Sequence, residues 1–299
     1  MWDAAGIVLV GGRSSRMGAP KAALEWHGST LLRRTTGIVS RATRGPTVVV
    51  RAAGQELPGL PSHVEVVDDP QPGMGPLQGI AAGLAVVSGR VSRAFICSTD
   101  LPFLHPAFVR AVLRPLRTAS GQEGTSGGPE DIADGHAADV ALPVAGGFPQ
   151  PLAAGYLTAL APLAARLVAQ ERLRPAFLFD QCRVVQLSES ALRAADPILA
   201  ALDPDLDSVL NINEPADYRA ARARPAPEIT IQCFGTLADG HRGPRVVRAA
   251  TVARAAATAG IALDGAAAVA LNGERVTGDS HTPLVTGDTV FFIGLEAGG

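Results

Sequence analysis

The stretch Gly6-Ile7-Val8-Leu9-Val10-Gly11-Gly12-Arg13-Ser14-Ser15-Arg16-Met17-Gly18-Ala19-Pro20-Lys21 decides the fold of this chain. Its first five residues are mostly apolar and partly β-branched, which is typical of a strand buried in a parallel sheet. Gly11 and Gly12 follow at once, and glycine lets the backbone turn sharply and approach a ligand without a Cβ in the way. Backbone N–H groups exposed in such a turn form an anion-binding concavity. The stretch therefore predicts a phosphate-binding loop at the end of a buried strand.

Lys21, which closes this stretch, is the one lysine among the 26 lysine and arginine residues of the chain. Lysine carries a compact ammonium on a flexible stem, whereas arginine is a broad planar fork, so the two are not interchangeable at a crowded anion. We expect Arg16 and Lys21 to contact a triphosphate. The spacing matches neither the Walker pattern nor the dinucleotide fingerprint. An ordinary solvated lysine is the alternative interpretation.

Composition excludes several classes of protein. The net charge of −2 gives no reason to expect nucleic acid or an anionic membrane as a partner. No apolar run reaches the roughly 18–20 residues that span a bilayer, and the N-terminus lacks the features of a signal peptide. The three cysteines, Cys97, Cys182 and Cys233, are widely spaced, and the six histidines lack metal-ligand spacing. These features predict a cytoplasmic protein without a zinc site.

Strand-like and helix-like segments alternate over the first two-thirds of the chain, which predicts an α/β fold with a mostly parallel, Rossmann-like sheet. We expect strands at residues 6–10, 47–50, 64–67, 93–97 and 139–143. Helical patterns cover residues 30–41, 76–87, 106–116, 156–170 and 214–222. The polar stretch 118–138 is expected to be a surface loop.

A change of pattern near residue 222 divides the chain into domains at residues 1–222 and 228–299. Residues 223–227 contain two prolines and no apolar periodicity, as linkers do. After them come an alternating strand at 228–234, a short helix at 251–259 and strands at 267–271 and 289–293, with an Asn272-Gly273 hairpin turn. This order predicts a small β-grasp (ubiquitin-like) domain.

Three polar sites follow the predicted strands or precede a helix. Asp100 comes after the strand at 93–97, and ligands of open α/β sheets sit beyond the carboxyl ends of strands. A carboxylate there can hold Mg²⁺ against phosphate oxygens; capping the next helix is the alternative. Asp69 is expected at the ribose or base of a nucleotide, unless it lies in a solvated turn. Asn211 and Asn213 face a polar ligand or form a turn before the helix.

The sequence contains no Ser/His/Asp or Cys/His arrangement for nucleophilic catalysis. Nucleotidyl transfer needs none, because positioning and electrostatic stabilisation supply most of the acceleration. The chain ends in Gly298-Gly299, an unbranched tail whose carboxylate can enter a narrow catalytic slot. The alternative is an ordinary frayed terminus.

Residues 1 to about 222 resemble the molybdenum cofactor guanylyltransferases. The resemblance lies in the stretch from Leu9 to Lys21, in Gly75-Pro76-Leu77-Gln78-Gly79, in Ser98-Thr99-Asp100-Leu101-Pro102-Phe103 and in Asn211-Ile212-Asn213-Glu214-Pro215. It implies an enzyme that joins a nucleoside monophosphate to a phosphorylated pterin and releases pyrophosphate. The implied nucleotide contacts are Leu9, Val10, Gly11, Gly12, Lys21, Asp69 and Asp100. It also implies that Asp100 holds Mg²⁺ and that Asn211 and Asn213 lie toward the pterin.

The resemblance has two departures. The family usually has alanine at the position of Val10, and it often has asparagine after the second strand, where this chain has Arg51-Ala52-Ala53. The second departure leaves the choice between GTP and CTP open.

Residues 228–299 resemble the sulfur-carrier subunit of molybdopterin synthase. The similarity lies in Leu271-Asn272-Gly273, in the stretch from Leu284 to Phe292 and in Gly298-Gly299. It implies that the last glycine is adenylated by an activating enzyme, becomes a thiocarboxylate and meets the large subunit of molybdopterin synthase. The thiamine-pathway sulfur carrier is the competing resemblance.

Three hypotheses follow. The first is an enzyme that transfers GMP from GTP to molybdopterin with Mg²⁺, fused to a sulfur carrier. The second is a sulfur carrier whose N-terminal domain is only a docking platform. The third is a cytidylyl- or sugar-nucleotide transferase with an appended domain. The first requires Lys21 and Asp100 to meet across one cleft.

Overall fold

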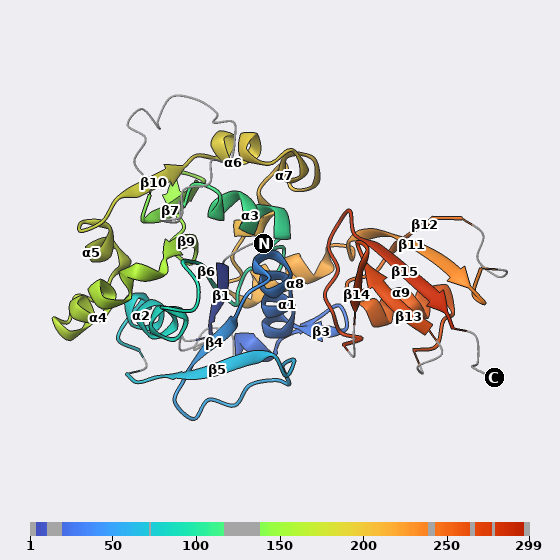
Figure 1. Cartoon of the computed structure of the whole chain (residues 1–299), viewed down its shortest axis with the longest axis horizontal. Coiled ribbons are helices and arrows are strands. Elements are labelled where there is room, and N and C mark those ends of the chain that lie inside the picture. Colours follow the sequence, from blue (N-terminus) through green and yellow to red (C-terminus); the bar gives the residue numbers. More distant parts are fainter. Residues whose placement is uncertain are drawn as a thin grey trace.

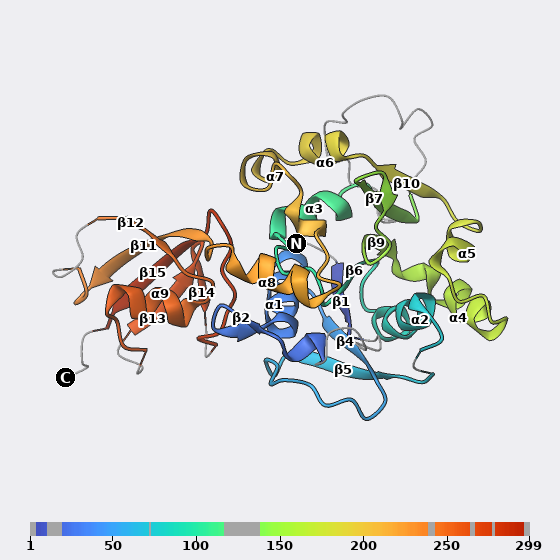
Figure 2. The ribbon, with the colours of Figure 1, turned by 180° about the vertical axis from the view of Figure 1, so that it is seen from behind.

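The computed structural model describes residues 4–10, 20–71, 73–116, 138–238, 243–263, 267–276 and 279–295. These residues form a large and a small sheet with separate hydrophobic cores, together with a two-stranded sheet of β2 (Glu25–Trp26) and β3 (Ser29–Thr30) (Figure 1). The large sheet and its helices occupy one side of the molecule, and the small sheet lies beyond helix α1 (Leu31–Thr43), as the view from behind also shows (Figure 2). We refer to the part built on the small sheet, from residue 228 onward, as the C-terminal region.

The large sheet has the strand order β10-β7-β9-β6-β1-β4-β5, with a short eighth strand, β8, paired to β7. The central strand β1 is parallel to both β4 and β6, whereas β9 runs antiparallel between β6 and β7. The predicted mostly parallel α/β sheet is therefore confirmed. Its strands are β1 (Ala4–Leu9), β4 (Thr47–Ala52), β5 (Val64–Asp69), β6 (Arg93–Ser98), β7 (Val140–Ala145), β8 (Phe148–Pro149), β9 (Ala153–Leu157) and β10 (Val184–Leu187).

Helices cover both faces of this sheet, and for that reason β1 is buried along its whole length. Helices α1 and α3 (Pro106–Leu113) share one core with Val8, and α2 (Pro76–Val87) and α4 (Ala161–Ala169) share the other with Ile7. A Cβ at Gly83 of α2 would lie 2.5 Å from Ile7 Cγ2, so glycine there lets the helix approach the sheet.

The remaining elements of the larger part are short. They lie at its edges or connect the layers, and they are η1 (Lys21–Ala23), β2 (Glu25–Trp26), β3 (Ser29–Thr30), η2 (Thr158–Leu160), α5 (Pro175–Phe179), α6 (Glu189–Ala195), α7 (Pro197–Leu202), η3 (Asp207–Val209) and α8 (Pro215–Ala223). Within the described part of the chain, no helix combines the length and apolar character needed to cross a bilayer.

The predicted helix at residues 156–170 is wrong in its first part. Tyr156 lies in β9, fully buried, and its hydroxyl donates to the Pro151 carbonyl over 2.8 Å. The helix begins only at Ala161. A short apolar run has no period that separates strand from helix. The predicted helix at 106–116 ends at Leu113 instead, and most of the predicted loop at 118–138 lies outside the described residues.

The small sheet has the order β12-β11-β15-β13-β14, with a parallel pair, β11 and β15, at its centre and antiparallel pairs outside it. Helix α9 (Val252–Ala259) supplies apolar side chains to the core on one face. Asn272 and Gly273 have φ values of 53° and 85°, which fit a type I′ hairpin turn. The strands are β11 (Glu228–Gly235), β12 (Arg245–Arg248), β13 (Ala267–Leu271), β14 (Glu274–Val276) and β15 (Thr289–Gly294).

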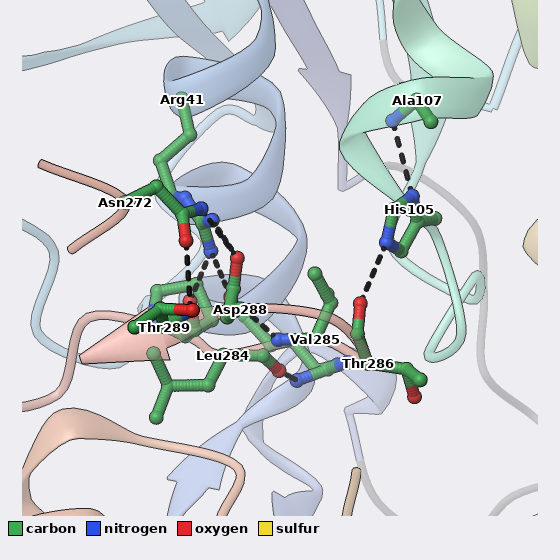
Figure 3. Close-up of polar contacts among 11 residues, drawn as sticks. Arg41, His105, Ala107, Asn272, Leu284, Val285, Thr286, Asp288 and Thr289 are labelled. Atoms are coloured by element: carbon green, nitrogen blue, oxygen red, sulfur yellow. Dashed lines mark hydrogen bonds and ion pairs between the residues drawn. The ribbon is translucent and has the colours of Figure 1, made fainter. Parts of the chain in front are cut away.

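A docking segment, residues 279–288, joins the C-terminal region to α1. Asp288 is buried, and its carboxylate accepts from both terminal nitrogens of Arg41 over 2.7 and 3.0 Å (Figure 3). The same carboxylate accepts from the Val285 N–H and the Asn272 side chain, over 2.9 and 2.7 Å. Its hydrogen-bonding capacity is thus used on both sides of the junction.

Apolar contacts complete this junction. Leu284 belongs to the core of the small sheet, whereas its neighbour Val285 enters the core under α1 and α3. On α1, a Cβ at Gly37 would lie 2.6 Å from Cδ of Pro283. Glycine at this position therefore lets the proline ring lie directly against the helix.

His105 connects the docking segment to α3. It is the N-cap residue of that helix, where Nδ1 accepts from the Ala107 N–H over 3.1 Å, and Nε2 lies 3.2 Å from the Thr286 carbonyl (Figure 3). Both bonds require the neutral imidazole with its proton on Nε2. Burial lowers the pKa of His105, while the Thr286 carbonyl, Asp288 and Asp203 partly oppose this shift.

Gly37→Ala tests whether the docking segment lies against α1, because the change in the free energy of unfolding has opposite signs on a free and on a covered helix face. On a free helix face, alanine stabilises relative to glycine by roughly 0.5–1 kcal/mol. Against the Pro283 ring it must displace the docking segment, so we expect the free energy of unfolding to fall by about 1–3 kcal/mol. Urea denaturation measures the change. Adding Pro283→Ala removes the ring and should reduce the cost of Gly37→Ala; a stabilising Gly37→Ala would contradict docking.

The lowered pKa of His105 predicts a loss of stability in acid. The neutral ring stabilises the fold fully above the unfolded-state pKa of about 6.5, and this contribution is lost as the pH falls through the lower folded-state pKa. One such group changes the free energy of unfolding by at most about 1.4 kcal/mol per pH unit.

Urea denaturation between pH 7.5 and pH 5 measures this effect. His105→Asn keeps an N-cap acceptor and should reduce the slope. Because burial also lowers the pKa of His27, part of the slope should persist. Equal slopes in the wild type and the variant would contradict the assignment.

Candidate nucleotide-binding site

The site is built where two neighbouring parallel strands end. In the register of β1 and β6, Leu9 pairs with Ser98. The chain that leaves β1 and the segment that carries Asp100 therefore start at the same edge of the sheet. This edge, beyond the carboxyl ends of the strands, is where open α/β folds bind ligands.

Lys21 and Asp100 meet at this edge. Lys21 opens the short helix η1, and its Nζ lies 3.2 Å from Oδ2 of Asp100. The other carboxylate oxygen, Oδ1, accepts from the Ser98 hydroxyl. The two side chains are only 20% and 17% exposed, so their charges are partly shielded from water. The sequence motif that contains Ser98 assigns this residue no role, although it lies two residues before the carboxylate it contacts.

The segment of Asn211 and Asn213 is fixed to the same place. Between them, Ile212 is fully buried, and its N–H donates to the Asp100 carbonyl over 3.0 Å. Both asparagines are exposed, and Asn213 Oδ1 lies 3.5 Å from Lys21 Nζ. The capping box of α8, in which Asp217 accepts from the Asn213 and Glu214 N–H groups, holds the turn. An ammonium, a carboxylate and a carboxamide thus converge.

Leu9 and Val10 can offer only backbone groups to a ligand. The Leu9 side chain is buried in the core with α2, and the Val10 side chain in the core with α1. The Val10 N–H is already bonded to the Val50 carbonyl over 2.8 Å. The predicted ligand residues Gly11, Gly12 and Arg16, and the tail glycines Gly298 and Gly299, lie outside the described residues.

Asp69 lies at the end of β5, two strands from β1 at the same edge. It is 9% exposed, and Oδ1 accepts from the Gln71 N–H over 3.0 Å, which stabilises the turn after the strand. The structure therefore gives Asp69 a local role in this turn and does not bring it into contact with Lys21 or Asp100 through any described bond.

The chemistry of the Asp100 carboxylate fits a magnesium ligand. Mg²⁺ is usually held by one or two carboxylates together with substrate phosphates and waters. Such a site needs no dense cluster of ligands, and the described residues contain no group of three or more His, Cys, Asp or Glu side chains that could hold a metal. The Asp100 side chain is partly exposed and lies beside the Lys21 ammonium. A metal ion held by Asp100 would therefore lie close to a phosphate bound by Lys21.

A separate cavity of about 260 Å³ lies at the junction with the docking segment. Its lining includes Trp26, Phe103, Arg34, Arg224 and Thr286. The Trp26 and Phe103 rings meet edge to face with centroids 5.4 Å apart, and Arg224 lies over the Phe103 ring at 4.6 Å. The two rings also belong to the hydrophobic cluster that contains Ile212.

The larger part of the chain is similar to known proteins. The sequence profile of the MobA-like NTP transferase domain matches residues 6–184. A probable molybdenum cofactor guanylyltransferase of Mycobacterium tuberculosis is 41% identical over 113 residues, which cover 37% of this chain and 55% of that protein. The chain thus spans about half the length of the mycobacterial relatives it matches. A protein of the same description from Pelotomaculum thermopropionicum is 29% identical over 222 residues, which cover 74% of this chain and 93% of the relative.

A solved structure shows the same fold for the larger part of the chain. The crystal structure of molybdopterin-guanine dinucleotide biosynthesis protein A from Archaeoglobus fulgidus matches with a TM-score of 0.51 and 21% identity, and covers 73% of this chain and 96% of that chain. The matched profile includes β1, β6, Lys21 and Asp100, the elements that build the site. The chain belongs to the MobA-like NTP transferase domain family.

Proposed function

We propose that this protein is a molybdenum cofactor guanylyltransferase, which transfers GMP from GTP to molybdopterin and releases pyrophosphate. The observation that carries the proposal is the 3.2 Å contact between Lys21 and Asp100 beyond the parallel strands β1 and β6. The names of the Mycobacterium and Pelotomaculum relatives support the choice of reaction.

The residues divide the work of the reaction between them. The Lys21 ammonium, with Arg16, neutralises charge on the triphosphate. Asp100 holds Mg²⁺, which when bound supplies further charge neutralisation at the phosphates. The terminal phosphate oxygen of molybdopterin attacks the α-phosphorus in line, the new P–O bond forms, and the bond to pyrophosphate breaks. The protein supplies positioning and electrostatic stabilisation and no nucleophile.

Substrate recognition is assigned to the surrounding residues. Leu9, Val10, Gly11 and Gly12 offer their backbone to the nucleotide, and Asp69 is proposed at its base or sugar. Asn211 and Asn213 present exposed carboxamides toward the pterin, and Asn213 already lies beside Lys21. The proximity of acceptor and triphosphate groups in one place is what an in-line transfer requires.

We further propose that residues 228–299 form a β-grasp sulfur-carrier domain, joined through a linker at 223–227 to a nucleotidyltransferase domain at 1–222. The order β12-β11-β15-β13-β14, with a central parallel pair and one helix on a face, supports the β-grasp assignment. Its partners would be an adenylating enzyme and the large subunit of molybdopterin synthase, and the terminal Gly298-Gly299 would carry the sulfur.

Removing either charge of the pair should stop transfer. Lys21→Ala and Asp100→Asn are expected to lower kcat for GMP incorporation into molybdopterin by about 10²–10³-fold, because the first removes a positive charge aimed at the transferring phosphate and the second removes the carboxylate proposed to hold Mg²⁺. Asp205→Asn makes the same chemical change at an exposed site and serves as the control. Near wild-type kcat in both site variants would refute the enzyme.

The nucleotide is tested in the same assay. GTP, CTP and sugar-nucleotide reactions are compared with and without molybdopterin, with radiolabelled α-phosphate as the readout. We expect incorporation from GTP that depends on the pterin. Preference for CTP or for a sugar phosphate acceptor would replace the guanylyltransferase by one of those transferases.

The carrier function is tested at the chain terminus. Full-length protein from cells should contain a fraction whose mass is raised by the replacement of one oxygen by sulfur, and deletion of Gly299 should abolish it. Intact-protein mass spectrometry measures both. Wild-type protein that never acquires this mass increase, even with an adenylating enzyme present, would rule out the sulfur carrier.

A further inference from the structure

We propose that Arg34 is a positioning residue for the nucleotidyl site, and that the docking segment of the C-terminal region sets the segment carrying Asp100 by holding Arg34. The inference rests on the proposed function of that site. Under this proposal, the C-terminal region helps to position the nucleotidyl site and is not merely attached to it.

Arg34 spans the junction with these bonds. From α1, its Nε donates to the Pro102 carbonyl over 2.6 Å, and its Nη1 donates to the Leu284 carbonyl over 3.1 Å. Pro102 lies two residues after Asp100, and Leu284 lies in the docking segment. The same planar fork therefore fixes the distance between the segment of Asp100 and the C-terminal region.

Because Arg34 is buried, loss of either of its hydrogen bonds would be costly. Arg34 is 5% exposed, and burial lowers the pKa of its guanidinium to about 10, with Arg41 acting in the same direction and Asp288 opposing it. The group is still charged at neutral pH, and a buried charge is costly unless its hydrogen bonds are satisfied. If the Leu284 carbonyl withdraws, Arg34 loses one of its two acceptors and must turn toward water. Its bond to Pro102 then weakens with it.

A second link reaches the same segment. Nε2 of His105 lies 3.2 Å from the Thr286 carbonyl, and the His105 N–H donates to Ser208 Oγ over 3.0 Å. Residues 102–105 are thus held at one end through Arg34 and at the other through His105, and both of these side chains bond to the docking segment. Figure 3 shows the His105 link and the Asp288–Arg41 pair on the same turn of the docking segment.

Other contacts across the junction do not reach Asp100, and they supply matched controls. Arg41 lies in the last turn of α1, Arg44 is the residue that caps its C-terminal end, and each forms an ion pair with the C-terminal region. The Arg41 partner, Asp288, is 4% exposed, whereas the Arg44 partner, Glu274, is 67% exposed. Removing Arg41 should therefore weaken docking, while removing Arg44 should change it little.

Hydrogen exchange of the full-length protein measures the coupling without turnover. In Arg41→Gln we expect the Leu104 and His105 amides to exchange about tenfold faster, which corresponds to about 1.4 kcal/mol weaker protection. Arg44→Gln should leave them within about threefold of wild type. Faster exchange of residues 279–288 in Arg41→Gln, with unchanged Leu104 and His105, would overturn the proposal.

Kinetics test the position of Asp100 itself. Arg34→Lys keeps the charge but loses the fork that spans two carbonyls. In it and in Arg41→Gln, we expect a roughly tenfold lower kcat and a higher Mg²⁺ concentration for half-maximal rate. A merely structural Arg34 would lower the thermal midpoint and leave the Mg²⁺ dependence of the folded enzyme unchanged, which would refute positioning.

The experiments distinguish failure of the proposed reaction from failure of the proposed coupling through Arg34. If the wild type transfers no GMP while the exchange of Leu104 and His105 still responds to Arg41→Gln, the coupling stands and the assigned reaction is wrong. If Arg34→Lys does not fold, Arg41→Gln decides the question, because Arg41 makes no described bond to residues 98–105.

Discussion

Parallel pairing of β1 with β6 is the constraint on which the rest of the molecule depends. It brings the ends of two strands that are nearly ninety residues apart in sequence to one edge, where Leu9 lies opposite Ser98. Because of this pairing, the ammonium of Lys21, which follows β1, can meet the carboxylate of Asp100, which follows β6. The pairing is stable because both faces of β1 are covered by apolar helices, which also excludes water from the strand hydrogen bonds.

Helix α1 serves both parts of the chain. Its apolar residues, such as Ile38 and Val39, are fully buried in the core of the large sheet. The adjoining side contacts the C-terminal region through Arg33, Arg34, Gly37 and Arg41. A helix that would otherwise be an exposed surface element is therefore covered on two sides, and its position is fixed by both.

Much of the larger part could be predicted from the sequence because its signals are local. Short β-branched runs marked the parallel strands, and the polar residues after them marked the edge with Lys21 and Asp100. The predicted helix at 156–170 includes the last two residues of the antiparallel strand β9, and the strand itself is not predicted, because Ala153-Ala154-Gly155-Tyr156 has no decisive period. Arg34 was missed for a different reason. Both its acceptors are backbone carbonyls, Pro102 and Leu284, which carry no side-chain signature.

The direction of β15 has a consequence for access. The strand starts at Thr289, directly after the buried Asp288, and runs to Gly294. At about 3.3 Å per residue, it carries the chain roughly 17 Å away from the junction. A macromolecule that binds the far end of the small sheet, beyond Gly294, would therefore not have to separate the C-terminal region from α1.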